Sequence, residues 1–500
     1  MCPSMDGAPA MQIWIQATVE GCHQREAARH RAFYFFFVWT GPAMCAPWSR
    51  DLVRCFVKER NLKLDNAKGI LITLVVIGHM LLPIQGTTRG VTNFFYMIYA
   101  FHMPAFVFIS GLLAQRIYTR VPKPAQTPTG NRAQRRQHRA ANAVGDRQMA
   151  SRAAAQLTTS GGVSGAAVAT EGHFNGRRWC STLWLYLLFQ FILFFSEIPA
   201  YGRTTRFPDF LHTSGAPWYL LALLFWYLMI PFFYAYRNFP YSLIAWIFLT
   251  IMSLAGGYLA SGALAGLGDF LALDRVIAFA PFFFAGYFIG PERLMRFLGA
   301  EQENVVAPEA GSKRASSRRR STEEVSKRAG RGIVLLLTAL GLLCFALVGT
   351  QTFDHLLPYR NVVYGAWYYR FHPEQNPAAF PGALAAQLWL IRFAWFLVSG
   401  LMSFALLSLM PNRRLPLLTT IGQRTLQIYI LHRPIRDLLL AGGFITAAGP
   451  ENSAHVLLLI TLSILLTIVL SAGILQRLFD TIQKLPERLL GCFSSCIKHV

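Results

Sequence analysis

Long apolar segments, separated by polar and often basic connections, form the main pattern of the chain. About ten of these segments approach the roughly 20 residues that a helix needs to cross a bilayer. They lie at 67–84, 94–114, 179–197, 217–236, 240–259, 275–290, 332–350, 386–410, 425–445 and 456–475. The pattern predicts an all-α fold, a polytopic membrane protein of about ten transmembrane helices embedded in a lipid bilayer.

The composition agrees with a membrane protein. Of the 500 residues, 54% are hydrophobic and only 14% are charged, whereas a soluble protein carries charge on about 25% of its residues. The net charge of +23 could suggest a nucleic-acid partner, and the basic run at 318–320 could bind nucleic acid or anionic lipid. Because most of this charge lies in the connections, we interpret it as a topology signal and expect no nucleic-acid partner.

The basic residues are unevenly divided between alternate connections. With the N-terminus in the cytosol, the connections at 116–178, 292–331 and 411–424 hold most of the lysines and arginines. The connections on the other side hold only Arg89, Arg203, Arg206, Arg360 and Arg370. This asymmetry follows the positive-inside rule and predicts cytosolic N- and C-termini. It does not distinguish the plasma membrane from an endomembrane such as the Golgi or the ER.

The polar segments divide the chain into one membrane domain and several extensions. Residues 1–55 lack a signal-peptide pattern and are expected to be a disordered extension or a non-native start. The membrane domain spans 56–490 and is interrupted by cytosolic loops at 116–178 and 292–331, whose composition predicts disorder. Residues 491–500 form a C-terminal tail. The cysteines include no C-x-x-C pair, so no disulfide framework is expected.

The first apolar segment carries three polar residues near one helical face. Lys68 and His79 are 11 residues apart, which places them within about 20° of each other and roughly 16 Å apart along the axis. Asp65 lies about 40° from the same line. Polar groups inside a membrane face the bundle interior or a wet cavity. This stripe is either part of a reaction site or includes a histidine that makes one interhelical hydrogen bond.

Two further apolar segments carry histidines. The second contains His102, followed by Ser110, whose expected role is close helix packing. The ninth contains Tyr429 and His432 on one face, at i and i+3. Three imidazoles on three apolar segments favour a shared site over packing alone. We expect no metal, because no carboxylate or H-x-x-x-H pair accompanies the histidines.

Five motifs in order resemble the acyltransferase-3 family of integral membrane O-acyltransferases, in particular the subgroup of fucose 4-O-acetylase-like acetyltransferases. The motifs are LDNAKGILITLVVIGHM, FHMPAFVFISG, APWYLLALLFWYLMIP, DRVIAFAPFFFAGYFIG and IGQRTLQIYILHRPI. The resemblance implies transfer of an acyl group, most often acetyl from acetyl-CoA, to a hydroxyl of a sugar or similar acceptor. The chain departs from the family in having Lys68 where an arginine is usual, and Ser181 where a second arginine is expected.

The resemblance also implies roles for individual residues. His79 would be the catalytic base or acyl relay, and His102 would orient it or polarise the thioester carbonyl. Lys68, Arg177 and Arg178 would bind the phosphates of the donor.

Four more residues are pocket candidates, each with a structural alternative. Tyr429 and His432 would complete the site or make structural hydrogen bonds. Trp218 would stack on a sugar or belong to the aromatic belt. Arg275 would contact the acceptor or pair with the adjacent Asp274. The rival functions are a polytopic transporter or exporter and a catalytically decayed homologue.

Overall fold

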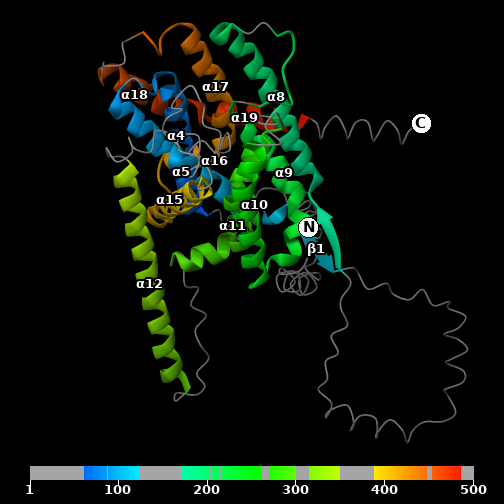
Figure 1. The fold of residues 1–500 in the computed structure, drawn as a ribbon, viewed down its shortest axis with the longest axis vertical. Coiled ribbons are helices and arrows are strands. Elements are labelled where there is room, and N and C mark those ends of the chain that lie inside the picture. The colour runs from blue at the N-terminus through cyan, green and yellow to red at the C-terminus, as the bar shows by residue number, and fades with distance from the viewer. Residues whose placement is uncertain are drawn as a thin grey trace, which may run out of the picture. The chain divides into compact units, whose positions relative to one another are not determined.

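The computed structural model describes residues 61–86, 88–122, 170–202, 205–213, 215–261, 270–299, 315–348, 388–447 and 453–485. The long helices are α4 (Leu62–Leu81), α5 (Arg89–Leu113), α8 (Gly176–Tyr201), α9 (Trp218–Phe233), α10 (Tyr241–Ser261), α11 (Leu273–Phe297), α12 (Ala315–Val348), α15 (Leu388–Leu409), α17 (Thr425–Ala441) and α18 (Ser453–Leu470) (Figure 1). The short helices are η2 (Leu82–Ile84), η3 (Ala114–Arg116), η4 (Tyr234–Tyr236), α16 (Leu418–Gln423) and α19 (Gly473–Gln483). Each of the ten predicted apolar segments coincides with one long helix.

The helices confirm an all-α polytopic membrane protein. In the part of the chain that the structure describes, 8 helices are long and apolar enough to cross a membrane. The other two predicted spans are α10, whose apolar part is shorter, and α17, which is 17 residues long and contains buried charged residues. Leu335 of α12 and Val469 of α18 are 70% and 63% exposed, as expected for helices that face lipid hydrocarbon.

The short connections between helices define two ends of the bundle. Helix α4 begins near Lys68 and ends near His79, and α5 returns in the opposite direction after only a few residues. We call these the Lys68 end and the His79 end. Alternation along the chain places the starts of α8 and α17 and the ends of α5, α9 and α11 at the Lys68 end.

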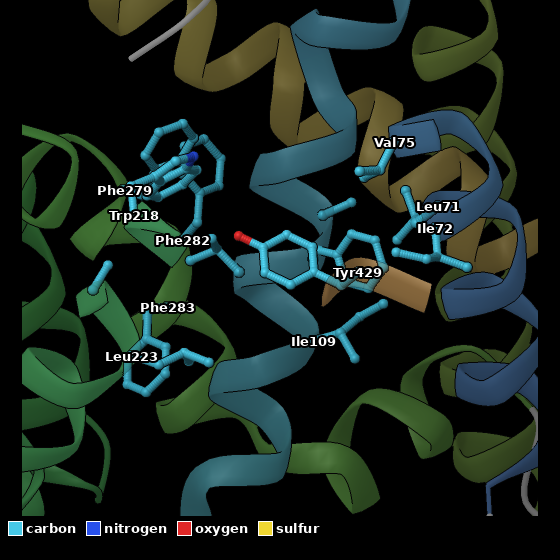
Figure 2. Close-up of a cluster of buried hydrophobic side chains, with 14 of the residues drawn as sticks. Leu71, Ile72, Val75, Ile109, Trp218, Leu223, Phe279, Phe282, Phe283 and Tyr429 are labelled. Atoms are coloured by element: carbon cyan, nitrogen blue, oxygen red, sulfur yellow. The ribbon is translucent and has the colours of Figure 1, made fainter. Parts of the chain in front are cut away.

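Close backbone contact fixes α5 against α11. A Cβ atom on Gly111 would lie 1.9 Å from the carbonyl oxygen of Phe283, and one on Gly286 would lie 2.1 Å from that of Phe108. Glycine at both positions therefore lets the two helix backbones touch. Aromatic and aliphatic side chains of α4, α5, α9 and α11 fill the core around this contact (Figure 2).

Parts of the two predicted cytosolic loops lie in regular elements. Strand β1 (Tyr118–Pro122) pairs antiparallel with β2 (Thr170–Phe174), and α12 already begins at Ala315. Strand pairing satisfies backbone groups without a large core, and a run rich in Arg, Lys, Glu and Ala forms a helix readily. The remainder of both loops, the extension 1–55 and the tail 491–500 lie outside the described residues.

Candidate functional site

Helices α4 and α17 bring two of the predicted histidines into contact. His79 Nδ1 lies 2.7 Å from His432 Nε2, and the two rings stack with centroids 5.0 Å apart. His432 is fully buried, whereas His79 is partly exposed. Two residues separated by 353 positions in the chain therefore form one imidazole pair.

The hydrogen bonds of His432 fix the tautomers of this pair. His432 Nδ1 lies 3.0 Å from the carbonyl oxygen of Ile428, and a carbonyl oxygen only accepts, so Nδ1 must donate. In a neutral imidazole the other nitrogen then accepts, and His432 Nε2 accepts from His79 Nδ1. The lone pair of His79 is thereby placed on Nε2, which has no hydrogen-bond partner among the described residues. An imidazole in this state can take a proton from a hydroxyl.

A compact group of buried charges adjoins the histidine pair. Arg436 Nε donates to the carbonyl oxygen of His79 at 3.2 Å, and Arg436 Nη1 lies 2.6 Å from Asp437 Oδ1. Arg433 Nε lies 3.2 Å from the same carboxylate oxygen, and Ser196 Oγ donates to Asp437 Oδ2 at 3.3 Å. We call Glu197, Arg433, Arg436 and Asp437 the charged cluster.

Helix α8 supplies the second anion of the charged cluster. Glu197 Oε1 lies 3.7 Å from Arg433 Nη2, so two carboxylates balance two guanidinium groups. All four residues are less than 9% exposed. Removing one partner of a buried ion pair costs about 3–5 kcal/mol, because the other charge is left uncompensated. The charged cluster therefore holds α17 rigidly against α8 and the end of α4.

The sequence prediction missed the charged cluster. Arg433, Arg436 and Asp437 follow His432 directly in HRPIRD, and Glu197 lies in the apolar run FFSEIP. Ionisable residues inside a membrane segment are rare and mark functional or paired positions. Their i, i+3 and i+4 spacing within an otherwise apolar helix was the available signal.

His102 lies on α5, the helix that follows α4 and packs against it. Its Nδ1 donates to the carbonyl oxygen of Ile98 at 2.7 Å, so a neutral His102 also has its lone pair on Nε2. The ring of Tyr99 packs edge-on against His102 at 4.8 Å. Tyr99 also lies against α4, since a Cβ on Gly78 would be 2.9 Å from Tyr99 Cε2. Tyr99 thus links His102 to the residue before His79.

Three hydroxyl side chains, Tyr429, Tyr219 and Ser110, follow one another from the histidine pair towards the Lys68 end; we call them the hydroxyl file. The ring of Tyr429 lies 6.2 Å from that of His432 and 5.6 Å from that of Tyr219. The Tyr219 hydroxyl is 2.5 Å from Ser110 Oγ. The Tyr429 hydroxyl donates to the carbonyl oxygen of Ala216, and Figure 2 shows this side chain among apolar groups of the core. Ser110 is therefore hydrogen-bonded to Tyr219 and Tyr429 to Ala216, and apolar side chains surround Tyr429.

The predicted cations lie far from the histidine pair. Lys68 Nζ forms an ion pair with Asp65 Oδ1 at 2.7 Å, and Asp65 also accepts a hydrogen bond from Gln423 at 3.2 Å. Arg177 and Arg178 are exposed at the start of α8. The guanidinium of Arg178 lies over the ring of Tyr227, 5.6 Å from its centroid. These residues share the Lys68 end but do not form one cluster in the structure.

Trp218 and Arg275 contact each other in the core. Trp218 stacks on Phe279 with ring centroids 5.1 Å apart (Figure 2). The guanidinium of Arg275 lies over the Trp218 ring at 5.3 Å, a cation–π contact. Asp274 accepts a hydrogen bond from the backbone N–H of Arg275 at 2.7 Å. Trp218 is only 9% exposed, so in this structure its ring faces the protein core.

A small hollow at the His79 end adjoins the charged cluster. Its volume is 30 Å³, and its polar lining includes Gln190, Glu197, Asp209 and His212. Asp209 Oδ2 lies 3.0 Å from His212 Nδ1. Partial burial acts to raise the pKa of Asp209, but hydrogen bonds from His212 and Leu211 outweigh this effect and lower the pKa. Glu197 is shared between this hollow and the charged cluster.

No group of three His, Cys, Asp or Glu side chains suited to a metal ion occurs among the described residues.

Comparison with known proteins gives matches near the N-terminal end of the helical bundle. A family model described as an acyltransferase domain matches residues 61–135, a range that contains Lys68, His79 and His102. The nodulation protein NolL of Mesorhizobium japonicum is 54% identical over 59 residues, which are 11% of this chain and 16% of that protein. NolL of Sinorhizobium fredii is 43% identical over 77 residues, 15% of this chain and 21% of that protein.

The matched region is a minor part of each relative. The chain aligns with no more than 21% of the length of these two proteins. No solved structure matches the chain.

Proposed function

We propose that this chain belongs to the acyltransferase-3 family and is a membrane O-acyltransferase that moves an acetyl group from acetyl-CoA to a hydroxyl of a carbohydrate-type acceptor. The observation that carries the proposal is the hydrogen bond between His79 Nδ1 and His432 Nε2 at 2.7 Å. Because this bond places the lone pair of His79 on Nε2, His79 is arranged as a general base.

The proposed reaction needs one base and no covalent enzyme intermediate. His79 Nε2 takes the proton of the acceptor hydroxyl while the hydroxyl oxygen attacks the thioester carbonyl carbon. The new ester C–O bond forms and the C–S bond breaks. The proton held by His79 then passes to the departing CoA thiolate. His432 stabilises the transient charge on His79 by accepting its Nδ1–H, in the way that a second group orients a catalytic imidazole.

Two neighbouring features support this assignment. The charged cluster holds the end of α4 through the bond from Arg436 to the His79 carbonyl oxygen, which restricts the position of the imidazole. His102, with its lone pair on Nε2, can accept a hydrogen bond from a bound substrate and orient it. A neutral His102 in this tautomer cannot donate from Nε2, so polarisation of the thioester carbonyl requires its protonated form.

The small hollow at the His79 end, which we call the acceptor hollow, is the proposed approach for the hydroxyl substrate. Glu197, Asp209 and His212 line it, and its volume of 30 Å³ admits one hydroxyl group of a sugar, to which carboxylate and imidazole groups can hydrogen-bond. The hollow is at the His79 end, while Lys68, Arg177 and Arg178 are at the other. A cytosolic donor and an acceptor on the opposite side of the membrane would fit this polarity. Cytosolic termini remain part of the proposal and rest on the distribution of basic residues.

The test is acetyl transfer by membranes that contain wild-type protein, His79→Ala or His455→Ala, incubated with radiolabelled acetyl-CoA and a mixture of glycans. We expect His79→Ala to lower the transfer rate by about 10²–10⁴-fold, the usual contribution of a general base. The matched histidine control is His455 on α18, which donates a hydrogen bond to the carbonyl oxygen of Ile445. His455→Ala should leave the transfer rate unchanged.

Three outcomes distinguish the proposal from its rivals. Full transfer by His79→Ala at equal protein level would remove His79 from the mechanism. Uptake of a substrate without a labelled covalent product would indicate a transporter. Absence of both from the wild type, across several acyl-CoA donors, would favour a decayed homologue.

A further inference from the structure

A polar hollow at the Lys68 end is separate from the histidine pair. It has a volume of 270 Å³ and lies between the ends of α5, α9 and α11. Its polar lining includes Gln115, Tyr234, Arg237, Asn238, Glu292 and Arg293. The volume is close to the lower end of the about 300–1,000 Å³ that is typical of small-molecule sites. We call it the basic hollow.

Two arginines of the basic hollow have no counter-ion in the described chain. The guanidinium of Arg237 lies 5.5 Å from the ring centroids of both Tyr234 and Tyr287. Neither Arg237 nor Arg293 forms an ion pair with any described residue. Stacking on two rings orients a guanidinium but leaves its N–H donors available. The basic hollow therefore presents an oriented cation without a carboxylate partner.

The surrounding backbone and side chains are arranged around the same space. Gly290 has a φ of 73°, and a Cβ there would lie 2.2 Å from Gln115 Nε2. Only glycine adopts this conformation readily, and it admits the Gln115 amide, which donates to the carbonyl oxygen of Tyr287 at 3.0 Å. Glu292 also lines the hollow; Glu292 and Arg293 are both exposed, so water and salt screen both of these charges. The net charge of the lining stays positive.

We infer that the basic hollow binds a phosphate-bearing nucleotide. Arg237 and Arg293 bind its phosphates, since guanidinium forks match phosphate oxygens. The side-chain oxygen of Gln115 and the amide of Asn238 are available for its ribose or base. A nucleotide is favoured over free phosphate because the volume of 270 Å³ is many times that of a site for one small group.

The identity of the nucleotide rests on the proposed function. If acetyl-CoA is the donor, the ligand is its adenosine 3′,5′-bisphosphate part. Gln115 and His102 are on or next to α5, about 20 Å apart at 1.5 Å per residue, a distance comparable with an extended pantetheine arm. The sequence led us to expect donor-phosphate binding by Lys68, Arg177 and Arg178. This inference assigns it to Arg237 and Arg293 instead.

The test measures binding rather than transfer. The full-length protein in phosphatidylcholine nanodiscs is titrated calorimetrically with CoA, with adenosine 3′,5′-bisphosphate and with pantetheine. The variants are Arg237→Gln and Arg293→Gln. The matched control is Arg296→Gln, which makes the same charge change on α11 at a residue that does not line the hollow.

We expect each of the two hollow variants to weaken CoA and adenosine 3′,5′-bisphosphate binding at least tenfold, about 1.4 kcal/mol, with unchanged pantetheine binding. Arg296→Gln should bind all three as the wild type does. Equal thermal unfolding midpoints among the four proteins would show that the losses are not caused by misfolding.

Several results would overturn the inference. CoA affinity that is equal in all four proteins would exclude the basic hollow, and acetyl transfer by the same proteins would leave the proposed function standing. Nanodiscs that contain phosphatidylglycerol test whether the hollow binds the phosphate of a lipid headgroup rather than that of CoA. If the variants alter association with this lipid and not with CoA, the hollow binds a lipid headgroup. Nucleotide binding through both arginines without any acyl transfer would instead support the site and contradict the proposed function.

Discussion

At the scale of single residues, the state of His79 depends on a group distant in sequence. The Ile428 carbonyl oxygen fixes the tautomer of His432, and His432 in turn fixes the tautomer of His79. A carbonyl oxygen in the backbone of α17 thus decides which nitrogen of His79 can act as a base. His432 acts through His79, so we regard it as a positioning residue.

Substitutions at His432 test this positioning role. His432→Leu removes the acceptor, and we expect kcat for acetyl transfer to fall about 10²-fold with little change in KM. His432→Gln keeps a side-chain oxygen that can accept from His79 Nδ1, and it should recover part of the loss. The measurement is steady-state kinetics in membranes with matched protein levels. Equal activity of the Leu and Gln variants would contradict a hydrogen-bonding role.

At the scale of elements, α17 is the helix that organises the site. It contributes His432 to the imidazole pair, three residues to the charged cluster, and Tyr429 to the hydroxyl file. Helix α17 is less uniformly apolar than the other spans, because one of its faces carries charged side chains. Among the described residues, those ions bind one another, Ser196 and Glu197 of α8 and the His79 carbonyl oxygen of α4, so the native position of α17 depends on both α8 and α4.

The contact between α5 and α11 is a second element-scale feature with a direct test. Gly111→Ala places a methyl group where a Cβ would lie 1.9 Å from the Phe283 carbonyl oxygen. Overpacking of this kind typically costs about 1–3 kcal/mol, so we expect a lower unfolding midpoint in detergent. Because His102 is on α5, acetyl transfer should fall as well.

Gly400→Ala is the matched control for this substitution. A Cβ on Gly400 meets no atom within 4 Å, and alanine favours a helix by up to about 1 kcal/mol over glycine. This variant should be as stable as the wild type or more so. If Gly111→Ala is equally stable, the α5–α11 contact is looser than the structure indicates.

At the scale of the whole molecule, the two ends of the bundle have different chemistry. The His79 end carries the acceptor hollow, and the Lys68 end carries the basic hollow. The proposed reaction joins a nucleotide-bearing donor from one side to a hydroxyl acceptor from the other. The orientation of the bundle in the membrane therefore decides from which side the donor and the acceptor would enter.

Cysteine labelling tests the orientation. Cys180 is exposed near the start of α8 at the Lys68 end, and Thr446 is exposed beyond α17 at the His79 end. In an otherwise cysteine-free chain, Cys180 alone should react with a membrane-impermeant maleimide only after the cells are permeabilised. Thr446→Cys alone should react in intact cells. The opposite pattern would place the N-terminus outside and reverse the proposed sides of donor and acceptor.

The sequence by itself determined the helices and part of the candidate site. Apolar segments of spanning length must be helical in lipid, because backbone groups there need partners within the segment. The α4 residues Lys68 and His79 could be placed on one face from helical geometry alone. The described helices confirm the fold class, while the roles of the individual site residues stay predictions.

Only the tertiary structure decided which faces meet. A hydrophobic pattern shows that a face is buried but does not identify the helix that covers it. The pairing of His79 with His432, the balance of Glu197 against Arg433, and the stacking of Arg237 on Tyr287 all depend on contacts between distant segments. The electrostatic energy of such groups is set by neighbours a few ångströms away, and those neighbours are chosen by packing rather than by local sequence.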